Sequence, residues 1–211
     1  MATADTTLQI PSNVTVQGDL AVNGNLPTYP RTSLEQDSFG SYPLHATGWR
    51  VWDAYQTALG TSSSDDLGIG TGTFATGLPY ITSGDVKNST TTRYARIVFQ
   101  LPVEYVSGQS VRITANAGML TTVASSSCTV DFEVYKSARD TTKTGSDLCS
   151  TSATTINSLT FAAKDFDITA TSLSPGDILD VRMTIACVDV ATGTVVQPAV
   201  ADVQFKLDVK G

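Results

Sequence analysis

Residues 179–187 have the sequence LDVRMTIAC, in which apolar side chains occupy every second position. The apolar series is Leu179, Val181, Met183, Ile185 and Cys187. Successive side chains of a β-strand point to opposite faces of its sheet, so this pattern predicts a strand with one face on a core. Such alternation is typical of antiparallel sheets whose other face is solvated.

Five further stretches have the same alternation. Their apolar series run over 97–103, 111–117, 128–134, 166–170 and 201–209. Residues 159–161 and 74–81 could supply two more strands. Turn signals lie between these stretches, and no clear helical pattern does. We therefore predict an all-β chain in which residues 93–211 form an antiparallel β-sandwich of the jelly-roll type.

The charge of the chain excludes some classes of function. Its 211 residues carry 13 Lys and Arg against 20 Asp and Glu, a formal net charge of −7. Affinity for nucleic acid comes mostly from clustered Lys and Arg, so we expect no nucleic-acid partner. No apolar run is long enough to cross a bilayer, so we expect no membrane partner. Residues 1–30 contain no basic side chain and nothing like a secretion signal, so we expect synthesis in a cytoplasm.

The N-terminal residues 1–26 contain a short repeat. The units Val16-Gln-Gly-Asp-Leu20 and Val22-Asn-Gly-Asn-Leu26 place Gly between apolar residues at a six-residue spacing. A unit this short cannot bury its own apolar face and has to stack on further repeats or on a partner. We predict an extended N-terminal β arm that contacts a partner through Val14, Val16, Leu20, Val22 and Leu26. An edge hairpin packed on its own domain is the alternative.

Residues 27–92 are irregular, and we predict a linker and long loops packed on the sandwich. Trp49, Trp52 and Leu59 could share one helical face, whereas residues 49–53 could equally form a strand. We expect Trp49 and Trp52 to contact a partner. Packing of this region on the sandwich is the alternative.

Several patterns that resemble catalytic or ligand sites have a simpler structural explanation. Residues 68–72, GIGTG, resemble a phosphate-binding loop, but no helical pattern follows them. Asp65 and Asp66 lack the alternating ligands of a calcium loop. Asp165 and Asp167 fall on the solvated face of a predicted strand, although a glycosidase needs two carboxylates.

No pattern indicates catalysis. The single His45 has no recognisable nucleophile motif beside it. We therefore predict no catalytic residues, no cofactor and no metal, and a protein that is not an enzyme.

The three cysteines have no metal-binding spacing. Cys128 and Cys187 are in phase with apolar strand positions, which favours buried thiols. Cys128 and Cys149 flank a predicted hairpin, and a bridge between these two is the alternative.

Residues 14–26 resemble the Val-x-Gly-x-Leu repeats of tailed-bacteriophage fibre and appendage proteins. Residues 94–102, YARIVFQLP, and 174–182, SPGDILDVR, are similar to jelly-roll virion proteins of phages. The resemblance implies a virion structural protein, commonly a trimer, docked on a capsid or tail. Fibres normally carry more repeats than two. The resemblance therefore favours a capsid decoration, or cement, protein that clamps the major capsid protein or another virion protein as a homotrimer.

Three alternatives remain. A phage head or tail fibre that binds host glycans would need an aromatic groove, for which the candidates are Trp49, Trp52, Tyr80 and Tyr105. A glycan hydrolase would need two inward-facing carboxylates in a cleft. A major capsid protein would usually carry a basic arm, which residues 1–30 lack.

Overall fold

The computed structural model describes residues 37–123 and 126–210, which form an all-β sandwich. The first sheet holds β1 (Asp37–Pro43), β2 (Gly68–Gly70), β3 (Tyr80–Thr82), β5 (Val111–Met119), β9 (Ala162–Ile168) and β11 (Pro198–Lys210). The second sheet holds β4 (Ser89–Gln100), β6 (Ser126–Ser137), β7 (Lys143–Thr144), β8 (Thr154–Thr155) and β10 (Ile178–Asp189).

Residues 1–26, with the predicted contact residues Val14, Val16, Leu20, Val22 and Leu26, lie outside the described part of the chain. Within the described part, the only helix is the single 3-10 turn η2 (Ala46–Gly48). No helix among these residues is therefore long and apolar enough to cross a membrane.

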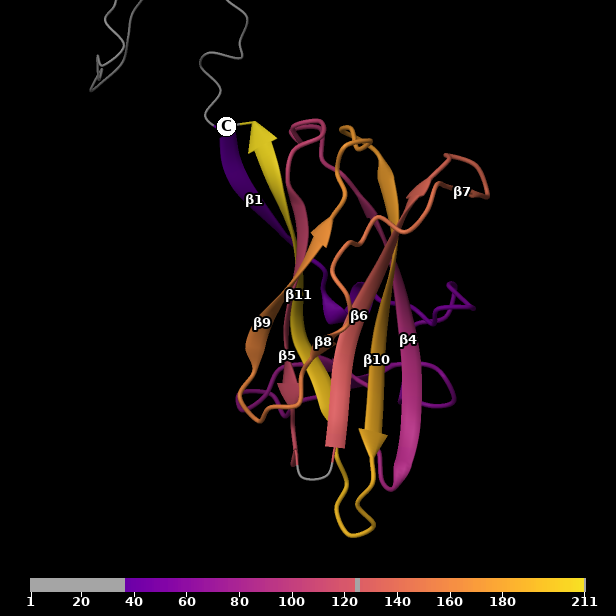
Figure 1. The fold of residues 1–211 in the computed structure, drawn as a ribbon, viewed down its shortest axis with the longest axis vertical. Helices are drawn as coiled ribbons and strands as arrows, with labels where there is room; N and C mark the ends of the chain where they lie inside the picture. Colours follow the sequence, from indigo (N-terminus) through magenta and orange to yellow (C-terminus); the bar gives the residue numbers. More distant parts are fainter. Residues whose placement is uncertain (1–36, 124–125, 211) are drawn as a thin grey trace, which may run out of the picture. The chain divides into compact units, whose positions relative to one another are not determined.

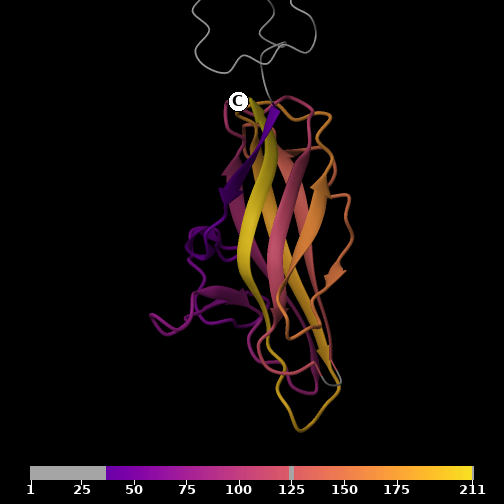
Figure 2. The ribbon, with the colours of Figure 1, turned by 90° about the vertical axis from the view of Figure 1, so that its left-hand side faces the viewer.

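The strand order is that of a jelly roll. The first sheet has the order β2-β3-β11-β5-β9, with β1 also beside β11, and the second has the order β4-β10-β6-β7, with β8 beside β6. Each long strand from β4 onward lies in the opposite sheet from the long strand before it, and Figures 1 and 2 show the two sheets face to face. The predicted antiparallel jelly-roll sandwich is confirmed.

The six strands predicted from alternation are all present, as β4, β5, β6, β9, β10 and β11. In β10 the apolar series from Leu179 to Cys187 is completely buried, and the intervening side chains face outward. Of the two optional segments, residues 80–82 form β3, whereas residues 159–161 precede β9.

Aromatic rings from both sheets fill the core between them. Phe99 of β4 stacks on Phe205 of β11 with ring centroids 4.4 Å apart, and Phe132 of β6 meets Phe166 of β9 edge-on at 4.8 Å. Trp49 packs on the same cluster, 6.3 Å from Phe132. These contacts join the two sheets directly.

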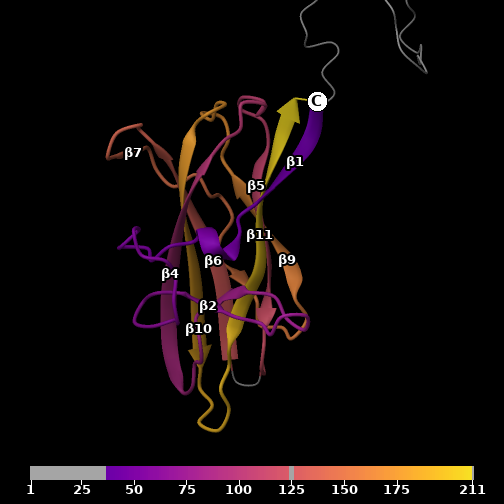
Figure 3. The ribbon, with the colours of Figure 1, turned by 180° about the vertical axis from the view of Figure 1, so that it is seen from behind.

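The region predicted as linker and loops supplies more of the sheets than expected. β1 pairs with β11 along its whole length, from Asp37 opposite Lys210 to Pro43 opposite Gln204, and β4 begins at Ser89 rather than at 93. The start of β1 and the end of β11 lie side by side at one end of the sandwich (Figures 1 and 3). The residues of β1, DSFGSYP, show no apolar alternation, because Ser, Gly and Pro occupy most positions. Their hydrogen bonds with β11, which alternation does not predict, place them in the sheet.

Neither structure predicted around Trp49 forms. Of residues 49–53, it is Arg50 that pairs with the edge of β4, its N–H donating to Arg96 O at 2.9 Å and its carbonyl accepting from Arg96 N at 3.0 Å. The chain then turns back so that Val51 N donates to Thr57 O. Side chains before and after this contact therefore point to opposite sides: Trp49 enters the core, and Trp52 stays at the surface.

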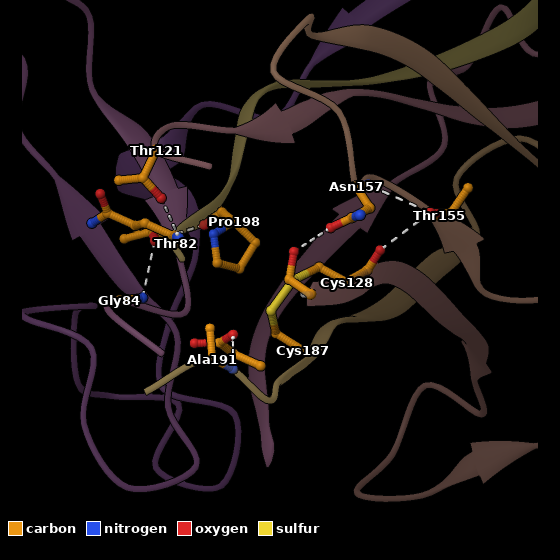
Figure 4. Close-up of a disulfide and its surroundings, with 12 residues drawn as sticks. Thr82, Gly84, Thr121, Cys128, Thr155, Asn157, Cys187, Ala191 and Pro198 are labelled. Atoms are coloured by element: carbon orange, nitrogen blue, oxygen red, sulfur yellow. Dashed lines mark hydrogen bonds between the residues drawn. A yellow bond between two sulfur atoms is a disulfide. The ribbon is translucent and has the colours of Figure 1, made fainter. Parts of the chain in front are cut away.

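Cys128 and Cys187 form a disulfide across the second sheet (Figure 4). They occupy directly opposite positions on β6 and β10, and both are completely buried. Both cysteines are buried as expected, but they are bridged and are not the free thiols that their strand phase favoured. The alternative bridge from Cys128 to Cys149 is also wrong, because Cys149 is a free thiol. Cys149 instead lies beside β9, where it pairs with Ile168.

Candidate binding face on the second sheet

The outer face of the second sheet carries charged and aromatic side chains in rows across three strands. β10 is the central strand, with β4 on one side and β6 on the other. Two adjacent rows, written in the order β4, β10, β6, are Arg96, Arg182, Glu133 and Val98, Asp180, Tyr135. Side chains that share a face in this way are close enough to interact across strands.

The charges in these rows form ion pairs. Arg96 donates from Nε and Nη2 to the two carboxylate oxygens of Asp180, each at 2.6 Å. This hydrogen bonding raises the pKa of Arg96 above its ordinary value. Arg182 pairs with Glu133 on the neighbouring strand. The side chains of both pairs are about one third exposed, so they are reachable from solvent.

The loop after β1 covers one side of this face with two aromatic rings. Trp52 packs on Tyr94 of β4 with ring centroids 5.2 Å apart, and its indole N–H donates to Asp65 Oδ2 at 3.1 Å. The guanidinium of Arg182 lies 4.8 Å from the centroid of the Tyr94 ring. The Tyr55 hydroxyl accepts the N–H of Val98 at 3.1 Å.

Arg93 of β4 holds residues 62–64 of the same loop region in place. Its Nε donates to Ser64 O at 3.0 Å, and its Nη1 donates to Ser62 Oγ and Ser83 O. The loop that carries Trp52 and Asp65 is thus fixed to the sandwich at several points.

A groove of about 380 Å³ runs over this face. Its lining residues are Trp52, Asp53, Arg96, Glu133, Tyr135, Lys143, Asp180 and Arg182. A second hollow shares Arg96, Lys143 and Asp180 and continues beneath the turn between β6 and β7, past Asp140 and Thr142. The Lys143 ammonium lies 3.3 Å from the centroid of the Tyr135 ring. We call the two hollows together the outer groove.

The aromatic groove that the glycan-binding alternative would need does not form from its four candidate residues. Trp49 and Tyr105 are completely buried, and Tyr80 belongs to β3 of the first sheet. Only Trp52 of the four lies in the outer groove. Trp49 packs in the core against Phe132, so it offers no surface to a partner.

Alternation did not predict the groove residues on the strands. Arg182 and Tyr135 alternate with apolar positions and were expected to face outward, and Arg96 was not singled out. Strand phase places each on the solvated face, but it does not give the register between strands that sets them side by side. The signal in the sequence is that three neighbouring outward positions of β10, Asp180, Arg182 and Thr184, are all polar.

Asp165 and Asp167 lie outside the sandwich, as the strand phase predicts. Arg112 on the neighbouring strand β5 donates to both, at 3.2 Å to Asp165 and 2.7 Å to Asp167, and Thr114 donates to Asp165 at 2.7 Å. Arg112 has a raised pKa because of its hydrogen bond to Asp167. The two carboxylates are therefore held in an exposed cross-strand network on the first sheet.

Asp65 and Asp66 hold the loop together. Asp65 accepts the Trp52 indole, and Asp66 exchanges backbone hydrogen bonds with Ser63. Burial raises the pKa of Asp66, and the charges of Asp65 and Asp53 add to the rise. In residues 37–123 and 126–210 no three His, Cys, Asp or Glu side chains gather in a way that could hold a metal ion.

The glycine-rich residues 68–72 are packing positions. A Cβ on Gly68 would lie 2.1 Å from the backbone N of Ser62, and one on Gly70 would lie 2.2 Å from the Tyr80 ring. Gly68 to Gly70 form β2, so no helix follows that could hold a phosphate. His45 lies at the start of η2 with no capping hydrogen bond from its side chain, and Ser41 donates to Gln204 at 2.7 Å.

Comparison with known proteins gives no family. No protein-family model matches the sequence, and no curated protein matches it. Among solved structures, the CBM22-1 xylan-binding domain of Xyn10C from Paenibacillus barcinonensis is similar over 83% of this chain and 97% of that domain, with 13% identity and a TM-score of 0.43. A chain of infectious bursal disease virus, Gx strain, is similar over 89% of this chain and 63% of its own length, with 13% identity and a TM-score of 0.20. Because both TM-scores are below 0.5, neither similarity bears on function.

Proposed function

We propose that this chain is a virion structural protein of the capsid-decoration type. In this proposal residues 1–26 attach the sandwich to the major capsid protein or to another virion protein. The assembly is a homotrimer, as the resemblance to phage virion proteins implies. The protein stabilises the particle by binding and performs no catalysis.

The pairing of β1 with β11 is the observation that supports this role most directly. β1 is the first described strand, so the N-terminal segment joins the sandwich at Asp37. β1 pairs with β11 through seven residues, and β11 also pairs with β5 along most of its length. A partner held by the N-terminal segment is therefore connected through β1 to β11 and β5 of the first sheet.

The outer faces of the sandwich also suit a displayed domain. Charged side chains on both sheets are paired with one another, as in Arg112 with Asp165 and Asp167, and Arg96 with Asp180. Mixed, paired surface charges with a net negative total favour solubility before docking. The buried disulfide adds resistance to unfolding outside the cell.

The proposed mechanism is mechanical. Each N-terminal arm adds a strand to a neighbouring protein, with main-chain hydrogen bonds giving affinity and the alternating side chains giving specificity. A clamp that binds only the assembled particle stabilises that state by mass action.

Deletion of residues 1–26 tests the attachment. We expect the full chain to be a trimer by light scattering and to sediment with purified particles that lack it. The deletion variant should keep the cooperative unfolding of the sandwich but no longer sediment with particles. A paired substitution sharpens the test, because Leu20→Asp should abolish sedimentation whereas Asn23→Ala, at a polar position of the same repeat, should leave it unchanged.

A monomeric full chain that does not bind particles would contradict the decoration role. Binding to isolated tails in place of capsids would instead support the fibre-type alternative.

A further inference from the structure

We propose that the outer groove is a binding site for a neutral oligosaccharide. This site goes beyond the proposed attachment role and uses none of residues 1–26.

The charges that line the outer groove nearly balance. In the hollow beside Trp52, three lining residues are acidic, Asp53, Glu133 and Asp180, and three are basic, Arg96, Lys143 and Arg182, and the second hollow adds Asp140. Arg96 and Arg182 are already paired with Asp180 and Glu133. A charged ligand that bound Arg96, Asp180, Arg182 or Glu133 would have to compete with one of these ion pairs and leave its partner unpaired. The groove therefore favours a ligand that is polar and uncharged.

The paired groups keep unused hydrogen-bonding capacity. Asp180 accepts one bond from Arg96 at each oxygen, whereas a carboxylate can accept about four. Arg96 uses two of the roughly five donors that a guanidinium offers. A hydroxyl group can donate and accept at once, so adjacent hydroxyls can bridge such a carboxylate and guanidinium without changing the charge balance. Sugars provide adjacent hydroxyls of this kind.

Aromatic rings flank the polar centre. Trp52 rests on Tyr94 of β4, and Tyr135 belongs to β6, with β10 between these two strands. Tyr94 lies opposite Thr184 of β10 and Tyr135 lies opposite Asp180, so the two positions are about 10 Å apart across the sheet and about 13 Å apart along it. A free ring face binds the apolar C–H face of a sugar, and the Lys143 ammonium already covers one face of Tyr135. The polar edges of the sugars meet the charged groups between the rings. This separation suits several linked sugars better than one.

The shape of the groove agrees with an extended ligand. The hollow beside Trp52 and the hollow beneath the β6–β7 turn share Arg96, Lys143 and Asp180, so the two parts of the outer groove adjoin each other. Thr141 and Thr142 add hydroxyl groups at its far end. β7 pairs with the end of β6, whereas Arg50 pairs with β4, so these two segments belong to opposite edges of the second sheet.

The test measures binding of the full chain to defined hexasaccharides by calorimetry. The neutral probes are cellohexaose, maltohexaose and chitohexaose, and the acidic probes are a galacturonic acid hexamer and a heparin hexasaccharide. We expect at least one neutral probe to bind and the acidic probes to bind more weakly. Trp52→Ala should weaken binding of the neutral probe by about tenfold or more, and Asp53→Ala should weaken it by a smaller factor.

A matched control uses an exposed aromatic residue elsewhere. Phe39 of β1 is 55% exposed on the first sheet, so Phe39→Ala should leave affinity unchanged. Fluorescence gives a second readout in the wild type, in case Trp52→Ala folds poorly. Trp49 is completely buried, so acrylamide should quench mainly the emission of Trp52. A bound sugar should protect that emission from quenching.

Three results would overturn the proposal: no binding of any neutral probe, equal binding by wild type, Trp52→Ala and Asp53→Ala, or tighter binding of the acidic probes. Each leaves the attachment role intact, because sedimentation with particles is measured separately and should be the same for the groove variants and the wild type.

Discussion

The carboxylate of Asp147 accepts the backbone N–H of Val134 at 2.8 Å, although Val134 lies in the middle of strand β6. Two residues earlier, the N–H of Phe132 is accepted by the Asp131 side chain at 3.0 Å. β10 pairs with one edge of β6, whereas at the other edge β7 and β8 pair with the two ends only and leave the middle part without a strand neighbour there. Carboxylates thus satisfy consecutive edge N–H groups that could otherwise pair with another chain.

Replacing Asp147 should destabilise the sandwich and expose this edge. Asp147→Ala removes the bond to Val134 and a second one to the N–H of Cys149 at 2.9 Å. We expect a loss of about 1–3 kcal/mol in the free energy of unfolding, measured with urea, and faster aggregation on mild heating. Asp147→Asn keeps an acceptor oxygen and should lose less. Equal behaviour of the two variants would show that the acceptor does not protect the edge.

Replacing Asp131 should change stability in a pH-dependent way. Burial raises the pKa of the Asp131 carboxyl, and the Glu133 and Asp147 charges add to the rise. A carboxyl with a raised folded-state pKa favours folding below its unfolded pKa, and this advantage is lost as pH rises through the folded-state pKa. Asp131→Asn should therefore unfold at a higher Tm than wild type at pH 7. The gain should shrink as pH falls toward about 4. A gain that stays constant from pH 7 to pH 3 would contradict this assignment.

The disulfide should make a large contribution to stability. Cys128 and Cys187 are 59 residues apart in sequence, and closing a loop of this length is worth about 4 kcal/mol in the chain-entropy model. We expect the Cys128→Ala, Cys187→Ala double variant to lose a comparable free energy of unfolding in guanidinium. Cys149→Ala is the matched control and should lose much less. A double variant as stable as wild type would show that the bridge does not form in solution.

Cys149 should be a slow thiol. Burial raises the pKa of Cys149 to about 11, and thiolate is the reactive form. In native protein at pH 8, reaction with a disulfide reagent such as DTNB should be much slower than that of free cysteine. One thiol should react quickly once the chain is unfolded without reductant. Three reactive thiols after unfolding would mean that Cys128 and Cys187 are reduced.

The last strand should be indispensable. Truncation after Val203 removes residues 204–210, which pair with β1 on one side and β5 on the other. It also removes the buried Phe205, Leu207 and Val209. Burial of these three side chains stabilises the fold by roughly 5–8 kcal/mol, which equals the whole free energy of unfolding of many domains. We expect no cooperative thermal transition. Deletion of Gly211 alone should leave Tm unchanged, and a cooperative transition in the longer truncation would contradict the prediction.

Alternation predicted which way side chains point within a strand, and it did not predict which strands meet. Asp165 and Asp167 were expected on the solvated face and lie there, because the two-residue period depends only on local geometry. The Cys128–Cys187 bridge needs the register between β6 and β10, which a sequence pattern does not contain. The register between strands also brings the groove residues Arg96, Asp180 and Tyr135 together, so alternation does not predict their proximity.

Irregular segments were the least predictable. Trp49 was expected to contact a partner, and Tyr105 was a candidate for the groove of the glycan-binding alternative. Both are buried, because long-range contacts decide where they lie. Tyr105 pairs with Val209 of the last strand, and its hydroxyl donates to Gln109 O at 2.8 Å. Neither contact leaves a periodic signal in the sequence.

The antiparallel contact of β1 with β11 also determines how the domain bears tension. A pull on Asp37 directed along β1 acts in shear, so it loads the hydrogen bonds of all seven residue pairs at once. A pull perpendicular to the strands would break the same bonds one after another. A sandwich held through its N-terminal end therefore resists drag best when the force runs along its strands.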